Sequence, residues 1–223
     1  MEARLSGINR NETLQYLGYR GSAIPARVLA DIERCEELLV RTARPRAVWK
    51  LFALLPDGTL AGTDFTPQGR DVPELLRDCD QVILMAATLG AEAETLLRRS
   101  QYRDMGDAVI LDAAASAAIE NVCDNLCGDL AQSFSPRFLT DRFSPGYGDF
   151  PFAQQRQLFA ALDVTRQIGV SLSESGLMLP QKSVTALLGV SDRPQPRRRR
   201  GCAYCPNFEN CAFRREDKSC GNQ

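Results

Sequence analysis

The spacing of apolar residues predicts two helices near the start of the chain. Asn9, followed three residues later by Glu12, is typical of a helix start, and Gly18 would end that helix. Pro25 suits the first turn of a second helix. Apolar residues recur behind it at helical spacing, at Val28, Ile32, Cys35 and Leu39.

A third, long helix is predicted over residues 107–130, which hold no proline and have glycine only at position 128. Its apolar stripe consists of Leu111, Ala115, Ile119, Val122, Leu126 and Leu130. The alanine-rich run 113–118 carries little side-chain bulk, so either another element or a ligand could approach this helix closely. Periodicity alone favours ordinary tight packing over ligand approach.

Other patterns predict strands. Residues 47–55 are rich in strand formers and end in the turn sequence PDGT, which indicates a short hairpin. Residues 81–90 form a continuous apolar run bounded by charge and glycine, as in a strand buried on both faces.

The C-terminal half of the pattern alternates helix and strand. Residues 151–169 predict a helix with Pro151 near its start and Gly169 after its end, and residues 170–175 a strand. Residues 180–189 predict a last short helix that starts at Pro180.

The composition is typical of a soluble globular protein, since 44% of the 223 residues are hydrophobic and 25% are charged. It contains no apolar run of about 18 residues and begins without the apolar stretch of a signal peptide, so we expect a cytoplasmic protein that does not enter a membrane. In that reducing compartment the eight cysteines would be thiols, metal ligands or redox groups rather than disulfides.

The chain contains no histidine. This excludes Ser-His-Asp and Cys-His catalytic triads within the chain, imidazole ligands to zinc, and a histidine axial ligand to a haem or corrinoid.

Composition changes after residue 190, which predicts two units, 1–190 and 191–223. The second begins with the proline-rich, basic stretch SDRPQPRRRR and has a net charge of +4, against -5 for the first. Cysteines follow at spacings of two, five and eight intervening residues: Cys202, Cys205, Cys211 and Cys220. With no histidine available, they could form a four-thiolate zinc site, hold an iron-sulfur cluster, or bind no metal, although so short a segment needs some such cross-link to fold.

The sequence RFSPGYGDFPF, residues 142–152, is more constrained than a surface loop needs to be. Gly146 permits unusual backbone angles and close approach of a ligand, while Pro145 limits the conformations lost on ordering. Arg142 can grip a carboxylate with two hydrogen bonds, and Tyr147 offers a flat ring with a hydroxyl. These residues indicate either a pocket for a ligand with a carboxylate and an aromatic ring, or a structural turn with a surface arginine.

Residues 142–152 and 168–189 together resemble the activation domain, the S-adenosylmethionine-binding part, of cobalamin-dependent methionine synthase. That family carries Arg-x-x-x-Gly-Tyr, then Thr/Ser-Glu-Ser-x-x-Met-x-Pro, then a Ser-Val pair. The matching residues here are Arg142, Gly146 and Tyr147, then Ser173, Glu174, Ser175, Met178 and Pro180, then Ser183 and Val184. The likeness covers most of residues 107–189, and the N-terminal half is similar to the short stand-alone members of the family.

The resemblance implies an α+β fold, with a central twisted, mainly antiparallel sheet flanked by helices and a small Cys-rich C-terminal tail. It implies that Arg142 and Tyr147 contact S-adenosylmethionine. Ser144, Pro145 and Gly146 would offer backbone groups to the ligand. Glu174 would face the ligand's ammonium or sulfonium charge, or cap the next element. No catalytic side chain is expected.

The chain departs from the family pattern in two places. The large synthase has an acidic residue on the alanine-rich helix where this chain has Ser116, with Glu120 one turn later. The large domain also continues past the Ser-Val pair into aromatic residues near the cofactor, whereas this chain enters its arginine linker and cysteine tail.

The function implied is reductive reactivation of a corrinoid protein by S-adenosylmethionine-dependent methyl transfer to cob(I)alamin. The cobalamin would be held by a separate methionine synthase or other corrinoid protein, and the electron would come from a low-potential donor such as flavodoxin. Because this chemistry needs an electron, the resemblance favours an iron-sulfur cluster over zinc in the tail.

Two alternatives stay open at this point. A nucleic-acid-binding zinc protein would explain the RRRR run and the four-cysteine tail, but it would leave the net acidic residues 1–190 and the RFSPGYGDFPF segment without a role. The other alternative is a regulatory relative that has lost methyl transfer.

Overall fold

The computed structural model describes residues 3–19 and 24–195. The four cysteines of the tail, Cys202, Cys205, Cys211 and Cys220, lie outside the described residues, and so does most of the predicted unit 191–223.

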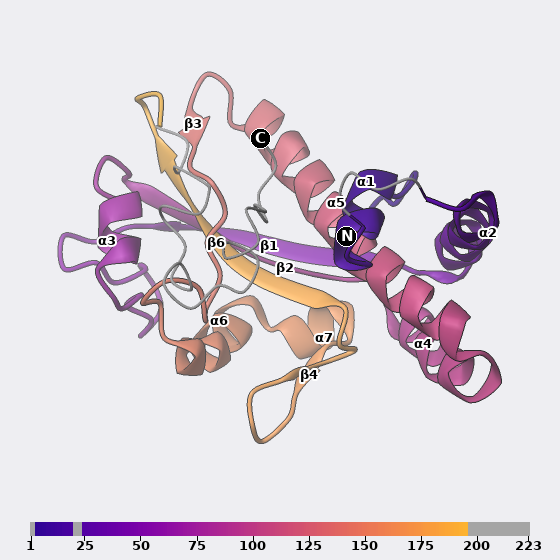
Figure 1. Cartoon of the computed structure of the whole chain (residues 1–223). Coiled ribbons are helices and arrows are strands. Elements are labelled where there is room, and N and C mark those ends of the chain that lie inside the picture. Colours follow the sequence, from indigo (N-terminus) through magenta and orange to yellow (C-terminus); the bar gives the residue numbers. More distant parts are fainter. Residues whose placement is uncertain (1–2, 20–23, 196–223) are drawn as a thin grey trace, which may run out of the picture.

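Helices and strands are interspersed along the described chain (Figure 1). The helices are α1 (Arg10–Tyr16), α2 (Ala26–Thr42), α3 (Asp71–Leu75), α4 (Ala91–Arg103), α5 (Met105–Ser133), α6 (Gln155–Leu162) and α7 (Val164–Ile168), with a 3₁₀ turn η1 (Phe152–Gln154). The strands are β1 (Arg46–Ala53), β2 (Gln81–Thr88), β3 (Phe138–Leu139), β4 (Ser171–Leu172), β5 (Met178–Leu179) and β6 (Ser183–Ser191).

Four strands form an antiparallel sheet in the order β1-β2-β6-β3, and β4 pairs with β5 in a separate hairpin. Met85 in β2 lies opposite Trp49 in β1 and Ala186 in β6. The expected α+β class with an antiparallel sheet flanked by helices is confirmed.

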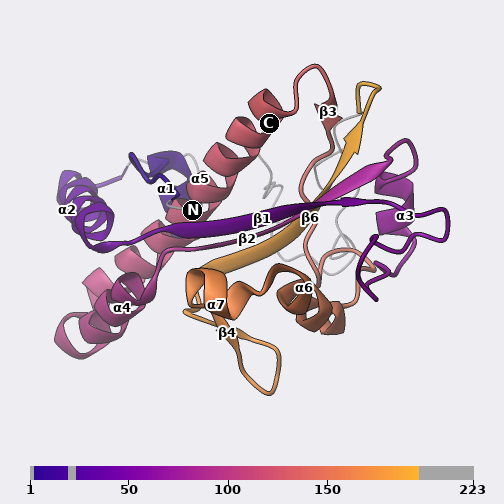
Figure 2. The ribbon, with the colours of Figure 1, turned by 180° about the vertical axis from the view of Figure 1, so that it is seen from behind.

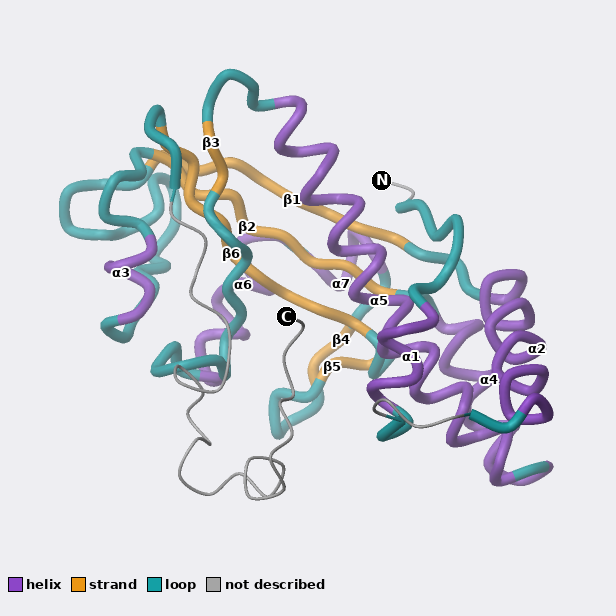
Figure 3. Tube along the Cα trace, turned by 45° about the horizontal axis from the view of Figure 1, so that its top comes forward, coloured by secondary structure: helices purple, strands orange, loops and turns teal. Residues whose placement is uncertain are grey.

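The sheet separates two hydrophobic cores, because successive side chains of a strand point to opposite faces. Ile83, Met85 and Ala87 of β2 belong to the core shared with α2, α4 and α5. The neighbours Val82, Leu84 and Ala86 belong to the core shared with α6 and α7. Figure 2 shows α6 and α7 against the sheet, and Figure 3 shows α5 crossing its other face. The prediction that residues 81–90 form a strand buried on both faces is therefore confirmed.

The alanine-rich run of α5 packs closely against the sheet. Ala114, Ala115 and Ala118 are fully buried in the same core as Met85 and Ala186. Small side chains let the helix backbone approach the strands, so this run serves tight packing, the interpretation that periodicity favoured.

The helices at the start of the chain and the turn after β1 follow their predictions. The side chain of Asn9 accepts a hydrogen bond from the amide of Asn11 at the start of α1, and α2 begins directly after Pro25. Leu54 and Leu60 bridge across the PDGT turn, so the hairpin forms, although it is short.

The prediction of a helix over residues 180–189 is wrong, because this segment enters the central strand β6. A short apolar run fits a buried strand as well as a helix, and pairing with β2 on one side and β3 on the other decides for the strand. β6 continues to Ser191, whose hydroxyl donates to the Asp78 carbonyl at 2.7 Å, one residue past the expected unit boundary.

The helix predicted over residues 151–169 is broken in two. Asp163 adopts left-handed angles, with φ of 54°, and separates α6 from α7. Helices α3 and α4 were not predicted.

Candidate functional site

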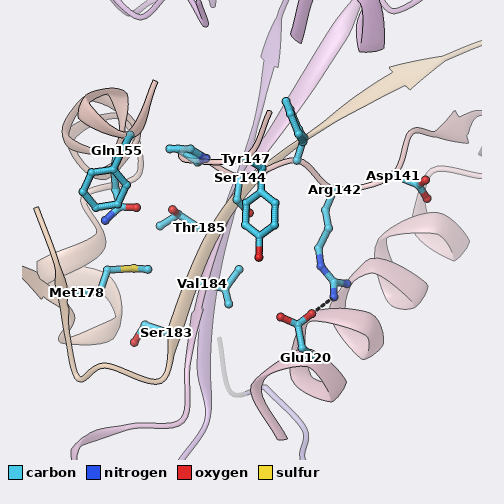
Figure 4. A pocket seen from close by; sticks show the side chains of 13 residues that line it. Glu120, Asp141, Arg142, Ser144, Tyr147, Gln155, Met178, Ser183, Val184 and Thr185 are labelled. Carbon is cyan, nitrogen blue, oxygen red and sulfur yellow. Dashed lines mark hydrogen bonds and ion pairs between the residues drawn. The ribbon is translucent and has the colours of Figure 1, made fainter. Parts of the chain in front are cut away.

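A pocket of about 590 Å³ lies between α5, the loop after β3, the start of α6 and the first residues of β6 (Figure 4). Its lining combines acidic, basic, aromatic and hydroxyl side chains: Glu120, Asp141, Arg142, Phe143, Ser144, Pro145, Tyr147, Phe152, Gln155, Met178, Ser183, Val184 and Thr185.

One wall is the constrained segment that the sequence singled out. The amide of Gly146 donates to the carbonyl of Phe150 at 2.9 Å, and the amide of Phe150 donates to the carbonyl of Tyr147 at 3.0 Å. Gly146 has φ of 91°, which other residues rarely adopt, and a Cβ added to it would lie 3.4 Å from the ring of Phe152. The turn closes on itself and leaves Tyr147 exposed at the pocket.

The same segment is fixed to the body of the protein at two further points. The rings of Phe143 and Phe150 stack with centroids 5.9 Å apart in the core shared with α6 and α7. The carboxylate of Asp149 accepts hydrogen bonds from the amides of Arg70 (2.8 Å) and Asp71 (3.0 Å) at the start of α3. The wall is therefore rigid, because both its apolar and its polar groups are engaged.

Arg142 points from this wall toward α5, where its guanidinium donates to the carboxylates of Glu120 and Asp124 (Figure 4 shows the first pair). Its side chain is 21% exposed, so it is not a free surface arginine. Burial opposes its charge, but the hydrogen bond to Asp124 and nearby negative charges outweigh burial and raise the pKa of Arg142.

Carboxylates outnumber cations at this end of the pocket. Glu12 of α1 lies near both carboxylates of α5. Its pKa is raised, first by burial and then by the negative charges of Asp124 and Glu120. One oxygen of Glu12, Oε2, is buried without a hydrogen-bond partner among the described residues. We call Glu12, Glu120 and Asp124 the acidic cluster. Among the described residues that line the pocket, Arg142 is the one cation.

The pocket gathers four of the six residues expected at the ligand site: Arg142, Ser144, Pro145 and Tyr147. Gly146 and Glu174 are not among the lining residues. Glu174 lies in the β4–β5 turn, where its backbone carbonyl accepts a hydrogen bond from Arg156. The proposal that all six residues bind a ligand stays a prediction.

Sequence reasoning did not assign Gln155 and Thr185 to the pocket. A signal for Gln155 was present, because a helix that starts behind Pro151 has its first turn directly after the constrained segment 142–152. Thr185 required residues 180–189 to be recognised as a strand, on which Ser183 and Thr185 share a face.

Among the described residues, no group of three or more histidine, cysteine or acidic side chains is arranged to hold a metal ion. Burial raises the pKa of Cys123 to about 12 and also raises that of Cys127, so both thiols stay protonated at neutral pH.

None of the described helices is long and apolar enough to cross a bilayer.

The chain was compared with known proteins. One solved structure, described as "Crystal Structure of the MetH Reactivation Domain bound to AdoHcy", matches this chain with a TM-score of 0.61 and 18% sequence identity. The match covers 82% of this chain and 73% of the chain in that structure. At this identity the match shows the shared fold. No curated protein matches. The family model "Vitamin B12 dependent methionine synthase, activation domain" matches residues 77–195, more than half of the chain and a segment that includes every residue lining the pocket. The chain therefore belongs to the family of activation domains of vitamin B12-dependent methionine synthase.

Proposed function

We propose that this chain binds S-adenosylmethionine in the Arg142 pocket and supports methyl transfer to cob(I)alamin held by a separate methionine synthase. The observation that carries the proposal is the meeting of Arg142 and Glu120 at one end of an aromatic pocket inside the family segment.

The charged end of the pocket suits the amino-acid end of the ligand, which carries both a carboxylate and an ammonium group. The ligand carboxylate would take the place of Asp124 on the guanidinium of Arg142, and the ammonium would bind Glu120. Glu174 was expected to face a ligand cation, but Glu120 is the better-placed carboxylate because it lines the pocket.

The remainder of the lining suits an adenosine group. Tyr147, Phe152 and Met178 present apolar surface, and Ser183 and Thr185 add hydroxyls near the strand. A volume of about 590 Å³ lies within the range of about 300–1,000 Å³ that ligand sites occupy.

Cobalamin is assigned to the partner because the chain has no histidine with which to hold it through an axial imidazole. A low-potential donor such as flavodoxin would supply one electron to reduce cob(II)alamin. The cobalt electron pair would then form the bond to the methyl carbon as the sulfur–carbon bond breaks, leaving S-adenosylhomocysteine. The part of this chain is to bind and orient the sulfonium, since the reacting atoms belong to its substrates.

The cysteine tail is proposed to hold an iron-sulfur cluster or zinc through Cys202, Cys205, Cys211 and Cys220. A cluster would place an electron carrier on the same chain as the methyl donor, whereas zinc would have a structural role.

The absorption spectrum of a partner methionine synthase that lacks its own activation domain tests the function. Adding this chain, S-adenosylmethionine and a low-potential reductant should convert cob(II)alamin to methylcobalamin, and leaving out any one of the three should prevent it. Equal conversion without the chain would refute the proposal.

A further inference from the structure

Four polar residues lie on one stripe of α5, four positions apart: Asp112, Ser116, Glu120 and Asp124. Arg142 pairs with the last two. Lys182 pairs with the first two, its Nζ lying 2.8 Å from both Asp112 Oδ1 and Ser116 Oγ. Two cations from different segments are thus bound to the same face of one helix.

The two cations come from the two walls of the pocket. Arg142 begins the rigid turn, and Lys182 directly precedes Ser183 and Thr185 of β6. The centres of the two contacts on α5 are eight residues apart, or about 12 Å along the helix. The pocket thus lies between two points at which its walls are tied to α5.

The surface between α5 and the sheet combines small and large apolar side chains. Ala114, Ala115 and Ala118 give close approach, while larger side chains such as Leu111 and Ile119 pack in the same core. Lys182 adds directional contacts to this non-directional packing, on the same stripe of α5 that carries Glu120.

Lys182 is well held to act in this way. Its side chain is 16% exposed, and its backbone carbonyl accepts a hydrogen bond from the amide of Leu89 at 3.0 Å. The preceding residue, Gln181, donates its amide to Glu94 of α4 at 3.0 Å. Ser116 Oγ donates to the Asp112 carbonyl, which leaves its lone pairs for the ammonium of Lys182.

We propose that Lys182 is a positioning residue that sets the register of α5 against β6 and thereby places Glu120 for the ligand's ammonium group. The inference rests on the proposed function for its ligand. It assigns Lys182 no contact with that ligand, because Lys182 does not line the pocket.

The test compares two ligands by titration calorimetry: S-adenosylhomocysteine, and 5′-methylthioadenosine, which lacks the amino-acid end. Lys182→Met should weaken binding of the first by about tenfold, as misplacement by a fraction of an ångström does, and leave binding of the second unchanged. Lys182→Arg should keep most of the wild-type affinity for S-adenosylhomocysteine. The matched control is Lys50→Met, which removes a lysine of β1 that bonds to the Ala161 carbonyl away from the pocket.

Equal weakening of both ligands by Lys182→Met, or of neither, would overturn the positioning role while leaving the proposed function in place. If the wild-type protein binds neither ligand, the proposed function fails instead. Hydrogen exchange in the ligand-free protein then decides on Lys182: faster exchange of residues 112–120 in Lys182→Met but not in Lys50→Met supports the inference, and unchanged exchange refutes it.

Discussion

Arg142→Ala removes the one cation among the described residues that line the pocket. A hydrogen bond to a charged group contributes about 1.5–3 kcal/mol, so S-adenosylhomocysteine should bind roughly 10- to 150-fold more weakly to the variant. The loss should be specific to ligands that carry the amino-acid end, because the aromatic lining is untouched.

The same change should lower stability only modestly. Arg142 forms two ion pairs, with partner side chains that are 36% exposed for Glu120 and 58% for Asp124. Exposed pairs contribute about 0.2–1 kcal/mol each, so the free energy of unfolding should fall by about 0.5–2 kcal/mol. Arg142 also lowers the pKa of Glu12, which burial and the other two carboxylates raise. Without the arginine the ionised form of Glu12 loses a stabilising positive charge, so the destabilisation should be larger at neutral pH than in acid, where Glu12 is protonated.

Arg137 supplies a matched control. Its side chain is 23% exposed against 21% for Arg142, and it too holds two carboxylates, Asp80 and Asp192, but it does not line the pocket. Arg137→Ala should therefore lose similar stability in thermal unfolding and keep full affinity in titration calorimetry. The assignment of Arg142 to the ligand carboxylate would be refuted if Arg142→Ala bound S-adenosylhomocysteine as tightly as the wild type, or if both variants lost affinity equally.

Three further outcomes are expected. Glu120→Gln should weaken S-adenosylhomocysteine by about 1–2 kcal/mol and spare 5′-methylthioadenosine, and unchanged binding of both in calorimetry would remove Glu120 from the ammonium site. Burial raises the pKa of Cys123 to about 12, against about 8.5 for a free thiol, so the stability that the protonated thiol contributes is complete below about pH 8.5 and is lost as pH rises toward 12. The free energy of unfolding in urea should therefore fall less steeply with pH over this range in Cys123→Ala than in the wild type, and an equal fall in both proteins would contradict this. Protein purified without oxygen should contain either iron and sulfide with visible colour or colourless zinc, whereas a metal-free tail would disprove metal binding by the four cysteines.

The sequence was enough to predict those helices and strands whose signal lies entirely within one segment. The Asn9 cap, the long glycine-poor stretch of α5 and the continuous apolar run of β2 each carry a signal within one segment. Residues 180–189 do not, because their apolar run suits a helix or a strand, and the choice depends on β2, about 100 residues earlier in the chain. The positive φ of Asp163 that breaks the predicted helix likewise has no marker such as glycine.

The candidate site divides in the same way. The wall made by residues 142–152 was predicted because glycine, proline and aromatic residues stand together there. The pairing of Arg142 with Glu120 and Asp124, and the approach of Glu12 from α1, join residues that are distant in sequence. Long-range electrostatic partners of this kind follow from the packing of α1 and the loop on α5, which a single sequence does not state.

The segment shared with the family begins at residue 77, yet the sheet does not begin there. β1, which precedes it, pairs along its whole length with β2, and α2 buries Cys35 and Leu39 against α5. A protein cut back to residues 77–195 would present a bare strand edge and an uncovered apolar helix face, both of which favour aggregation. The limits of the folding unit in this chain are therefore wider than those of the matched segment, because β1 and α2 complete the sheet and the core against which the pocket is built.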